Sequence, residues 1–102
     1  MAEAWIHATY DALFFDGSTP HTDRACQVLI NGGQIKIRYV EGEGNTVTYV
    51  GNERGPGHFE LSARNADGDG RATLHRFEGS KVLEGYWCEG NVRGMWRISM
   101  IS

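Results

Sequence analysis

Clusters of glycine with asparagine, aspartate, serine or proline interrupt this chain at a nearly regular interval, and they restrict its fold more than any other feature. Seven clusters follow one another roughly 10 to 14 residues apart, at residues 16–19, 31–33, 41–45, 51–57, 65–70, 78–80 and 89–94. These residue types favour tight turns, because glycine adopts a positive φ and Asn or Asp side chains bond to the nearby backbone. The clusters divide the chain into eight short segments.

The segments between the turns alternate between apolar and polar residues. Segment 34–41 places three apolar side chains on one face, namely Ile35, Ile37 and Tyr39. Segment 58–64 does the same with Phe59, Leu61 and Ala63. A period of two is expected for a strand with one buried face, so both segments are predicted to be strands.

Four further segments are less regular. Segment 92–100 places Val92, Gly94, Trp96, Ile98 and Met100 on one face, with Met95 as an exception on the other. Segment 81–89 opposes Leu83, Gly85 and Trp87 to a mixed face of Val82, Glu84, Tyr86 and Cys88. Segment 5–15 carries Ile6, Ala8, Tyr10, Ala12 and Phe14 on one face and Trp5, Leu13 and Phe15 on the other, a pattern expected of a strand covered on both sides. Segment 19–29 leaves room for a turn of helix before a strand.

Eight short strands joined by tight turns predict an all-β fold, an eight-stranded antiparallel up-and-down meander barrel. Short loops connect only adjacent antiparallel strands, and closure into a barrel removes the exposed edges that promote aggregation. The chain has 102 residues, 40% of them apolar, which is enough for one core. We therefore expect residues 1–102 to form a single β-barrel domain.

In the regular spacing of its predicted strands and turns, the chain resembles the calycin group of small β-barrels, the lipocalins and avidins. Gly94, Met95 and Trp96 form a Gly-x-Trp triplet similar to the one that lipocalins carry on their first strand, placed here on the last predicted strand. The resemblance implies an eight-stranded barrel that holds a small ligand at one open end. It is architectural only, since no family site motif matches this sequence.

Charge and cysteine content exclude several classes of partner. The net charge is −3, and no basic run is present to bind nucleic acid or an anionic membrane surface. No signal-peptide pattern or long apolar stretch is found, so we expect a soluble, cytoplasmic protein. Cys26 and Cys88 are too few for a disulfide framework and are expected to be thiols.

The sequence predicts no cofactor and no metal. Segment 65–76 resembles a calcium loop at four positions, Asn65, Asp67, Asp69 and Gly70, but Arg76 stands where the twelfth ligand must be a carboxylate. A hairpin turn explains these residues better. The glycines at 41–45 and 51–57 precede strands and not the helix start that a phosphate-binding loop needs. The four histidines show no ligand spacing.

Aromatic residues are the candidates for a ligand site. Trp87 and Trp96 fall on the apolar face beside Gly85 and Gly94, and a glycine next to a large ring makes room for that ring on the adjoining strand. Two interpretations remain open. The rings fill the barrel, or they line a small cavity whose predicted ligand-binding residues are Tyr10, Tyr39, Trp87, Trp96 and His75.

Three functional classes fit this chain. The first is a barrel that binds a small apolar or aromatic ligand. A second is an interaction module that self-associates through an aromatic patch of Trp5, Phe14 and Phe15, which leaves homo-oligomerisation open. The third is an isomerase or cyclase with a proton shuttle at the barrel mouth, for which the residues to inspect are His75, Glu84, Glu60 and Arg97. No activating dyad can be read from the sequence, so catalysis stays undecided.

Overall fold

The protein is an eight-stranded antiparallel barrel in which every strand follows its neighbour in sequence order. A computed structural model describes residues 2–40, 44–65 and 68–100. The strands are β1 (Ala2–Phe14), β2 (His21–Asn31), β3 (Gln34–Val40), β4 (Thr46–Gly55), β5 (His58–Asn65), β6 (Gly68–His75), β7 (Val82–Glu89) and β8 (Val92–Ser99). The predicted fold class is therefore confirmed.

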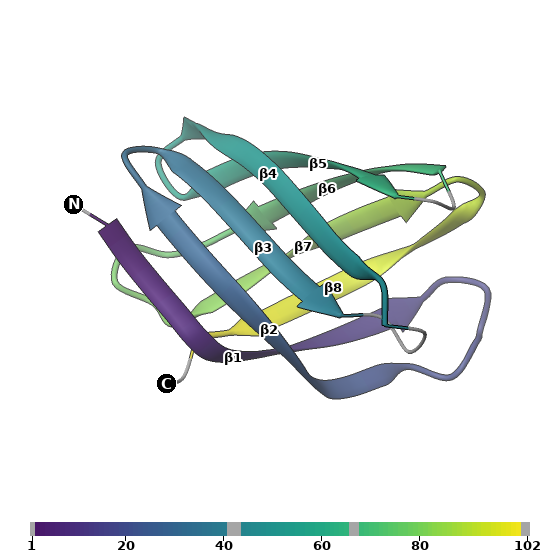
Figure 1. The fold of residues 1–102 in the computed structure, drawn as a ribbon. Coiled ribbons are helices and arrows are strands. Elements are labelled where there is room, and N and C mark those ends of the chain that lie inside the picture. Colours follow the sequence, from purple (N-terminus) through teal and green to yellow (C-terminus); the bar gives the residue numbers. More distant parts are fainter. Residues whose placement is uncertain (1, 41–43, 66–67, 101–102) are drawn as a thin grey trace.

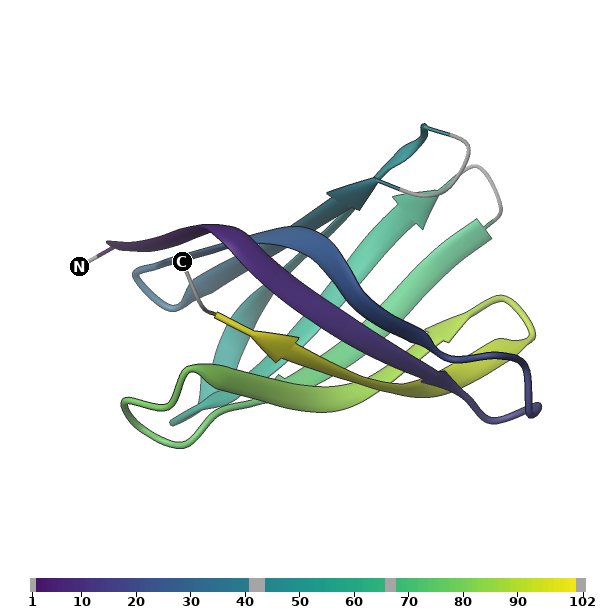
Figure 2. The same ribbon diagram turned by 90° about the horizontal axis from the view of Figure 1, so that it is seen from below.

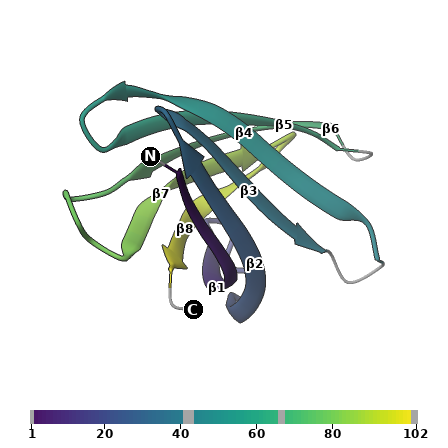
Figure 3. The same cartoon turned by 60° about the vertical axis from the view of Figure 1, so that its left-hand side comes forward.

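Closure of the barrel comes from antiparallel pairing between the first and last strands. The second half of β1 pairs with β8 from Thr9 opposite Ser99 to Phe14 opposite Gly94. β1 to β4 form one wall and β5 to β8 lie behind them (Figure 1), and β2, β3 and β4 run side by side in the rotated view (Figure 3). Both termini lie at the same end of the barrel (Figure 2).

The two ends of the barrel differ in the strands that they connect. The β1–β2, β3–β4, β5–β6 and β7–β8 connections lie at one end, which we call the open end. The other three connections and both termini lie at the opposite end, which we call the closed end. Parts of the predicted turns at 41–45 and 65–70 lie outside the described residues.

β1 departs from the alternation that its sequence predicts. A register shift against β2 between Trp5 and Ala8 reverses the parity of the strand. Ile6, expected inside with Ala8, is 62% exposed, whereas Trp5 packs partly against the core. The expectation of cover on both sides was also wrong, because Leu13 and Phe15 are exposed on the outer face. A β-bulge of this kind adds a residue to one strand, which period-two counting cannot detect.

The other irregular segments follow the strand pattern. Residues 21–31 form strand β2, and no helix occurs anywhere in the described ranges, including the stretch for which a helical turn was considered. Met95 and Val82 are exposed, as expected for the polar faces of β8 and β7. None of the described segments is a helix long and apolar enough to cross a bilayer.

The core changes in character from one end of the barrel to the other. Fully buried aliphatic side chains fill the half toward the closed end, contributed by Ile35, Leu74, Leu83 and Ile98. Aromatic side chains dominate the half toward the open end, contributed by Tyr10, Tyr39, Tyr49 and Trp87. The strand register therefore concentrates the aromatic rings near the open end.

An ion pair lies across the closed end. The guanidinium of Arg76 donates two hydrogen bonds of 3.1 Å to the two carboxylate oxygens of Glu3, and its Nε donates to the carbonyl oxygen of Ser80 at 2.6 Å. The Arg76 side chain is only 14% exposed and that of Glu3 38%. The hydrogen bonds from Arg76 lower the pKa of Glu3 below its ordinary value of 4.5. This bidentate pair fastens the start of β1 to the β6–β7 connection.

The Glu3–Arg76 pair makes stability depend on pH. Because the pKa of Glu3 is lower in the folded state than in the unfolded state, its contribution is present above about pH 4.5 and is lost as the pH falls through the folded-state value. We expect the wild type to be more stable than Glu3→Gln by up to about 1 kcal/mol at pH 7, since the pair is partly exposed, and this difference should shrink as the pH falls below about 4.5. Urea denaturation of both proteins across this range measures the difference.

Glu78→Gln is the matched control for that experiment. Glu78 is an exposed carboxylate in the same β6–β7 connection, and it makes no ion pair with the described residues. Its replacement should give a stability difference that stays constant with pH. A constant difference for Glu3→Gln as well would contradict the assigned role of the pair.

Candidate functional site

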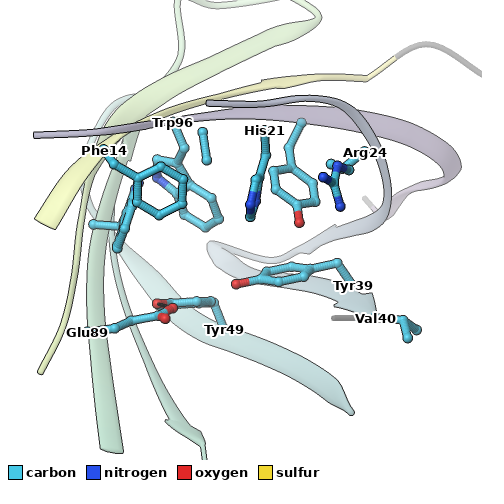
Figure 4. A pocket seen from close by; sticks show the side chains of 11 residues that line it. Phe14, His21, Arg24, Tyr39, Val40, Tyr49, Glu89 and Trp96 are labelled. Carbon is cyan, nitrogen blue, oxygen red and sulfur yellow. Dashed lines mark hydrogen bonds between the residues drawn. The ribbon is translucent and has the colours of Figure 1, made fainter. Parts of the chain in front are cut away.

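The open end of the barrel contains a pocket with a volume of about 240 Å³. Its walls come from β1, β2, β3, β4, β7 and β8, so it lies inside the barrel mouth and not on one face of the sheet. The lining residues are Tyr10, Ala12, Phe14, His21, Arg24, Tyr39, Val40, Tyr49, Trp87, Glu89 and Trp96 (Figure 4). The lining thus combines six aromatic rings of Phe, Tyr and Trp with a carboxylate, an imidazole and a guanidinium.

Small residues on the inner face leave space for this pocket. Ala12 lines it directly and pairs with Trp96 across the β1–β8 seam, and Ala72 pairs with Trp87 across β6 and β7. A large ring opposite a methyl group fills less of the interior than two branched side chains would. The barrel is therefore incompletely packed where an eight-stranded interior is otherwise just wide enough to be filled by its own side chains.

The structure brings together four of the five residues predicted to bind a ligand. Tyr10, Tyr39, Trp87 and Trp96 all line the pocket, and the rings of Tyr10 and Tyr39 lie 4.8 Å apart between centroids. The indole nitrogens donate to backbone carbonyls, from Trp87 to Met95 and from Trp96 to Thr73, each at 3.1 Å. These bonds use the polar edge of each indole and fix its orientation. Whether the four residues bind a ligand remains a prediction.

The structure also confirms that each of the two glycines lies opposite a tryptophan on the paired strand. Trp87 lies opposite Gly94, and Gly85 lies opposite Trp96, on the paired strands β7 and β8. A Cβ on Gly94 would come within 2.8 Å of the Trp87 ring and would overlap the Leu13 carbonyl oxygen. A Cβ on Gly85 would overlap the Thr73 carbonyl oxygen, which is the acceptor for Trp96. Both glycines are required for close approach of backbone and ring.

The fifth predicted residue, His75, lies away from the pocket. It is exposed on the outer face at the closed end, where its Nδ1 lies 2.9 Å from Nδ1 of its cross-strand partner His58. Its other cross-strand neighbour, Glu84, is exposed too and pairs with Arg97 at 3.1 Å. Glu60, 57% exposed in its side chain, contacts Arg54 at 3.5 Å. None of the residues named for a proton shuttle therefore reaches the barrel mouth.

A buried tyrosine and a half-buried glutamate form the main polar contact in the pocket. The hydroxyl of Tyr49, a residue only 1% exposed, donates a short hydrogen bond to Oε2 of Glu89. Burial raises the pKa of Tyr49 well above its usual range, and the bond to Glu89 raises it further. Tyr49 thus remains a hydrogen-bond donor at any physiological pH, and it holds the carboxylate of Glu89 in one orientation.

A backbone irregularity in β2 directs two more polar side chains to the pocket. Asp23 has φ = 53°, and its N–H donates to Oδ1 of Asp11 at 2.8 Å. The register between β1 and β2 shifts at this point, so His21 and Arg24, three residues apart, both line the pocket. Aspartate is among the few residues that tolerate a positive φ. The bulge therefore places an imidazole and a guanidinium at the mouth.

Sequence reasoning missed several lining residues for different reasons. Glu89 continues the inward parity of Leu83, Gly85 and Trp87, so alternation could have revealed it. Tyr49 follows Val47 at the same period in a segment with a clear pattern. His21 and Arg24 had no such signal, because they depend on the bulge. Among aromatic residues, Phe14 was assigned to an exposed patch, but its ring packs edge-on against Trp87 inside the pocket.

The proposed aromatic patch for self-association does not form. Phe14 lines the pocket, whereas Phe15 is 60% exposed on the outside with its ring 6.4 Å from that of Tyr86. Trp5 lies toward the other end of β1, with the Lys81 ammonium 5.6 Å from its ring centroid. The three rings therefore share no surface.

The structure also shows what the glycine-rich and cysteine motifs do. Arg76, the residue that breaks the calcium pattern, pairs with Glu3, and Asn65 pairs directly with Gly68 in the hairpin; Asp67 lies outside the described residues. In the described ranges no group of three or more His, Cys, Asp or Glu side chains could hold a metal. Cys26 and Cys88 are free thiols, and burial raises the pKa of Cys26 to about 12.

Comparisons with protein-family models, with curated proteins and with solved structures found no match for this chain.

Gly70 controls the position of the Tyr49–Glu89 pair. A Cβ at this residue would lie 2.5 Å from the Tyr49 hydroxyl and 3.2 Å from Cγ of Glu89. We expect Gly70→Ala to displace the tyrosine and to lower the free energy of unfolding by about 1–3 kcal/mol, as overpacking of a core does. Guanidinium denaturation measures the loss, and near-ultraviolet circular dichroism reports the movement of the ring.

Gly55→Ala provides the control, because a Cβ at Gly55 would meet nothing within 4 Å. Neither glycine has a positive φ, so the two variants differ in space and not in backbone strain. Gly55→Ala should be neutral or slightly stabilising. Equal stability of the two variants would show that Gly70 does not make room for Tyr49.

Proposed function

We propose that this protein binds a small ring-containing organic molecule in the open end of its barrel. The observation that carries the proposal is a pocket of about 240 Å³ walled by aromatic rings, with charged groups only at a few points. Binding sites for small molecules are mostly apolar cavities with a small number of placed polar groups. A barrel that needed only stability would be expected to fill this space with its own side chains.

The volume sets the size of the ligand. An apolar cavity of about 150 Å³ accommodates benzene in another protein, and pockets for drug-sized ligands begin near 300 Å³. At about 240 Å³, the pocket suits a molecule of one or two rings with a short substituent. The flat faces of Trp96 and Tyr39 favour a planar ring over a branched aliphatic chain.

Architecture and cysteine chemistry agree with this proposal. The chain resembles calycin-type barrels in strand number and order, and the members of that group hold small ligands at an open end. We place the protein in the cytoplasm, because Cys26 and Cys88 are both free and thiols are maintained in a reducing compartment. The ligand would then be a molecule of the cell interior.

Filling the pocket should abolish binding. Ala12→Phe adds a ring at a lining residue on the inner face of β1. With a panel of one- and two-ring compounds of different charge, we expect at least one to raise the melting temperature of the wild type by on the order of 10 °C at 100 times its Kd. Ala12→Phe should weaken its binding at least tenfold, as measured by quenching of Trp87 and Trp96 fluorescence.

Two variants control this measurement. Ala25→Phe makes the same change on the exposed outer face of β2 and should leave binding unaltered. Trp5→Phe removes the fluorescence of a tryptophan that does not line the pocket. If no compound shifts the melting temperature, or if Ala12→Phe binds as well as Ala25→Phe, the pocket is not the binding site and the proposed function is wrong.

A further inference from the structure

Glu89 is a half-buried carboxylate that makes no ion pair with the described residues. The ion pairs found among the described residues join Glu3, Glu60 and Glu84 to Arg or His, and none involves Glu89. The residues outside the described ranges include no Lys, Arg or His. Arg24 and His21 line the same pocket, but neither makes an ion pair with Glu89, and Arg24 lies on the opposite side of the pocket (Figure 4). The negative charge therefore faces the pocket without a counter-ion.

The Tyr49 hydroxyl satisfies only part of the hydrogen-bonding capacity of Glu89. A carboxylate has two oxygens and about four acceptor positions, and the bond from Tyr49 goes to Oε2 alone. This bond orients the group, while Oε1 remains available to a donor inside the pocket. Removing a carboxylate from water without a charged partner costs free energy, and a cationic ligand would recover it.

The rings around Glu89 favour a positive charge as well. Aromatic faces carry partial negative charge and attract cations, tryptophan most strongly. The Trp96 ring lies 5.2 Å from that of Tyr49, the residue bonded to Glu89, and Trp87, two residues before Glu89 on β7, lines the same pocket. A carboxylate with tryptophan and tyrosine rings beside it is the combination that binds an organic ammonium group.

Building on the proposed function, we infer that the ligand is a small amine with one or two rings, whose ammonium group binds Glu89. The ring of the ligand occupies the space beside Ala12, between Trp96 and Tyr39. Arg24, on the opposite side of the pocket from Glu89, repels the ammonium group. This repulsion determines the orientation of the bound ligand. An anionic ligand is disfavoured, because Arg24 is exposed and its attraction is screened by water and salt, whereas Glu89 is half-buried.

Three probes that share one ring and one chain length test the inference. Phenethylamine is a cation, 2-phenylethanol is neutral and phenylacetate is an anion at pH 7. By isothermal titration calorimetry we expect the wild type to bind phenethylamine at least about tenfold more tightly than 2-phenylethanol, and phenylacetate most weakly. Glu89→Gln keeps the size of the side chain and an acceptor for Tyr49, and it should abolish the preference, so that the amine and the alcohol bind with similar affinity.

Glu84→Gln is the control for charge. It removes the same charge from the same strand, but Glu84 is exposed on the outer face and paired with Arg97, so the preference for the amine should be unchanged. An equal loss of preference in both variants would mean that overall charge attracts the amine, and would overturn the inference. If Glu89→Gln does not fold, two other measurements test the inference. The wild type must bind the amine more tightly than the alcohol, and Glu89→Asp should retain part of that preference.

The probes separate this inference from the proposed function. If the wild type binds 2-phenylethanol as tightly as phenethylamine, and Ala12→Phe blocks both, the pocket binds ligands but does not select amines. If phenylacetate binds most tightly, Arg24 and not Glu89 determines selectivity. If none of the three probes binds, the inference is overturned, and the panel of one- and two-ring compounds with Ala12→Phe decides the proposed function separately.

Discussion

The structure depends on backbone pairing between β1 and β8, which turns a sheet of consecutive hairpins into a closed barrel. Six residue pairs, from Thr9–Ser99 to Phe14–Gly94, make that connection. Without it β1 and β8 would each present an unpaired edge, and the inner face of the sheet would be open to water. Closure requires an approach close enough that Gly94 lies against the Leu13 carbonyl, where no larger residue fits. The seam therefore explains one of the glycines beside the tryptophans.

The same seam determines where the pocket lies. Ala12 on β1 and the alternating Gly and Trp residues on β7 and β8 place large rings next to residues with little or no side chain. The Trp rings are held by bonds to the Met95 and Thr73 carbonyls, so they cannot relax into the remaining space without losing a hydrogen bond. Rigid rings around unfilled volume are a direct consequence of the geometry that closes the barrel.

The alternation of apolar and polar residues and the regular spacing of turns predicted most of the fold. Local irregularities in the strands account for the errors. Segments 34–41 and 58–64 have unbroken period-two patterns, and β3 (Gln34–Val40) and β5 (His58–Asn65) carry the predicted residues on their inner faces. The prediction for Ile6 was wrong because the bulge between Trp5 and Ala8 changes which alternate residues of β1 face the core. The hydrophobic pattern of the sequence does not reveal this bulge. The sequence predicted only part of the pocket lining, because alternation identifies apolar side chains better than polar ones. Rings were found because they are apolar and alternate, while His75 was nominated without any evidence of the direction in which it points.

The two ends of the barrel treat a carboxylate in opposite ways, and this contrast supports a functional interpretation of the pocket. At the closed end Glu3 is neutralised by a bidentate Arg76, beside a pocket of about 600 Å³ that both side chains line. At the open end Glu89 receives one hydrogen bond from Tyr49 and no cation from the described residues, beside unfilled space. A half-buried carboxylate without a cationic partner costs stability, and the Glu3–Arg76 pair shows that this fold has the means to avoid that cost. Natural proteins break local rules of packing and pairing mainly at functional sites, and the proposed amine would supply the positive charge that Glu89 lacks.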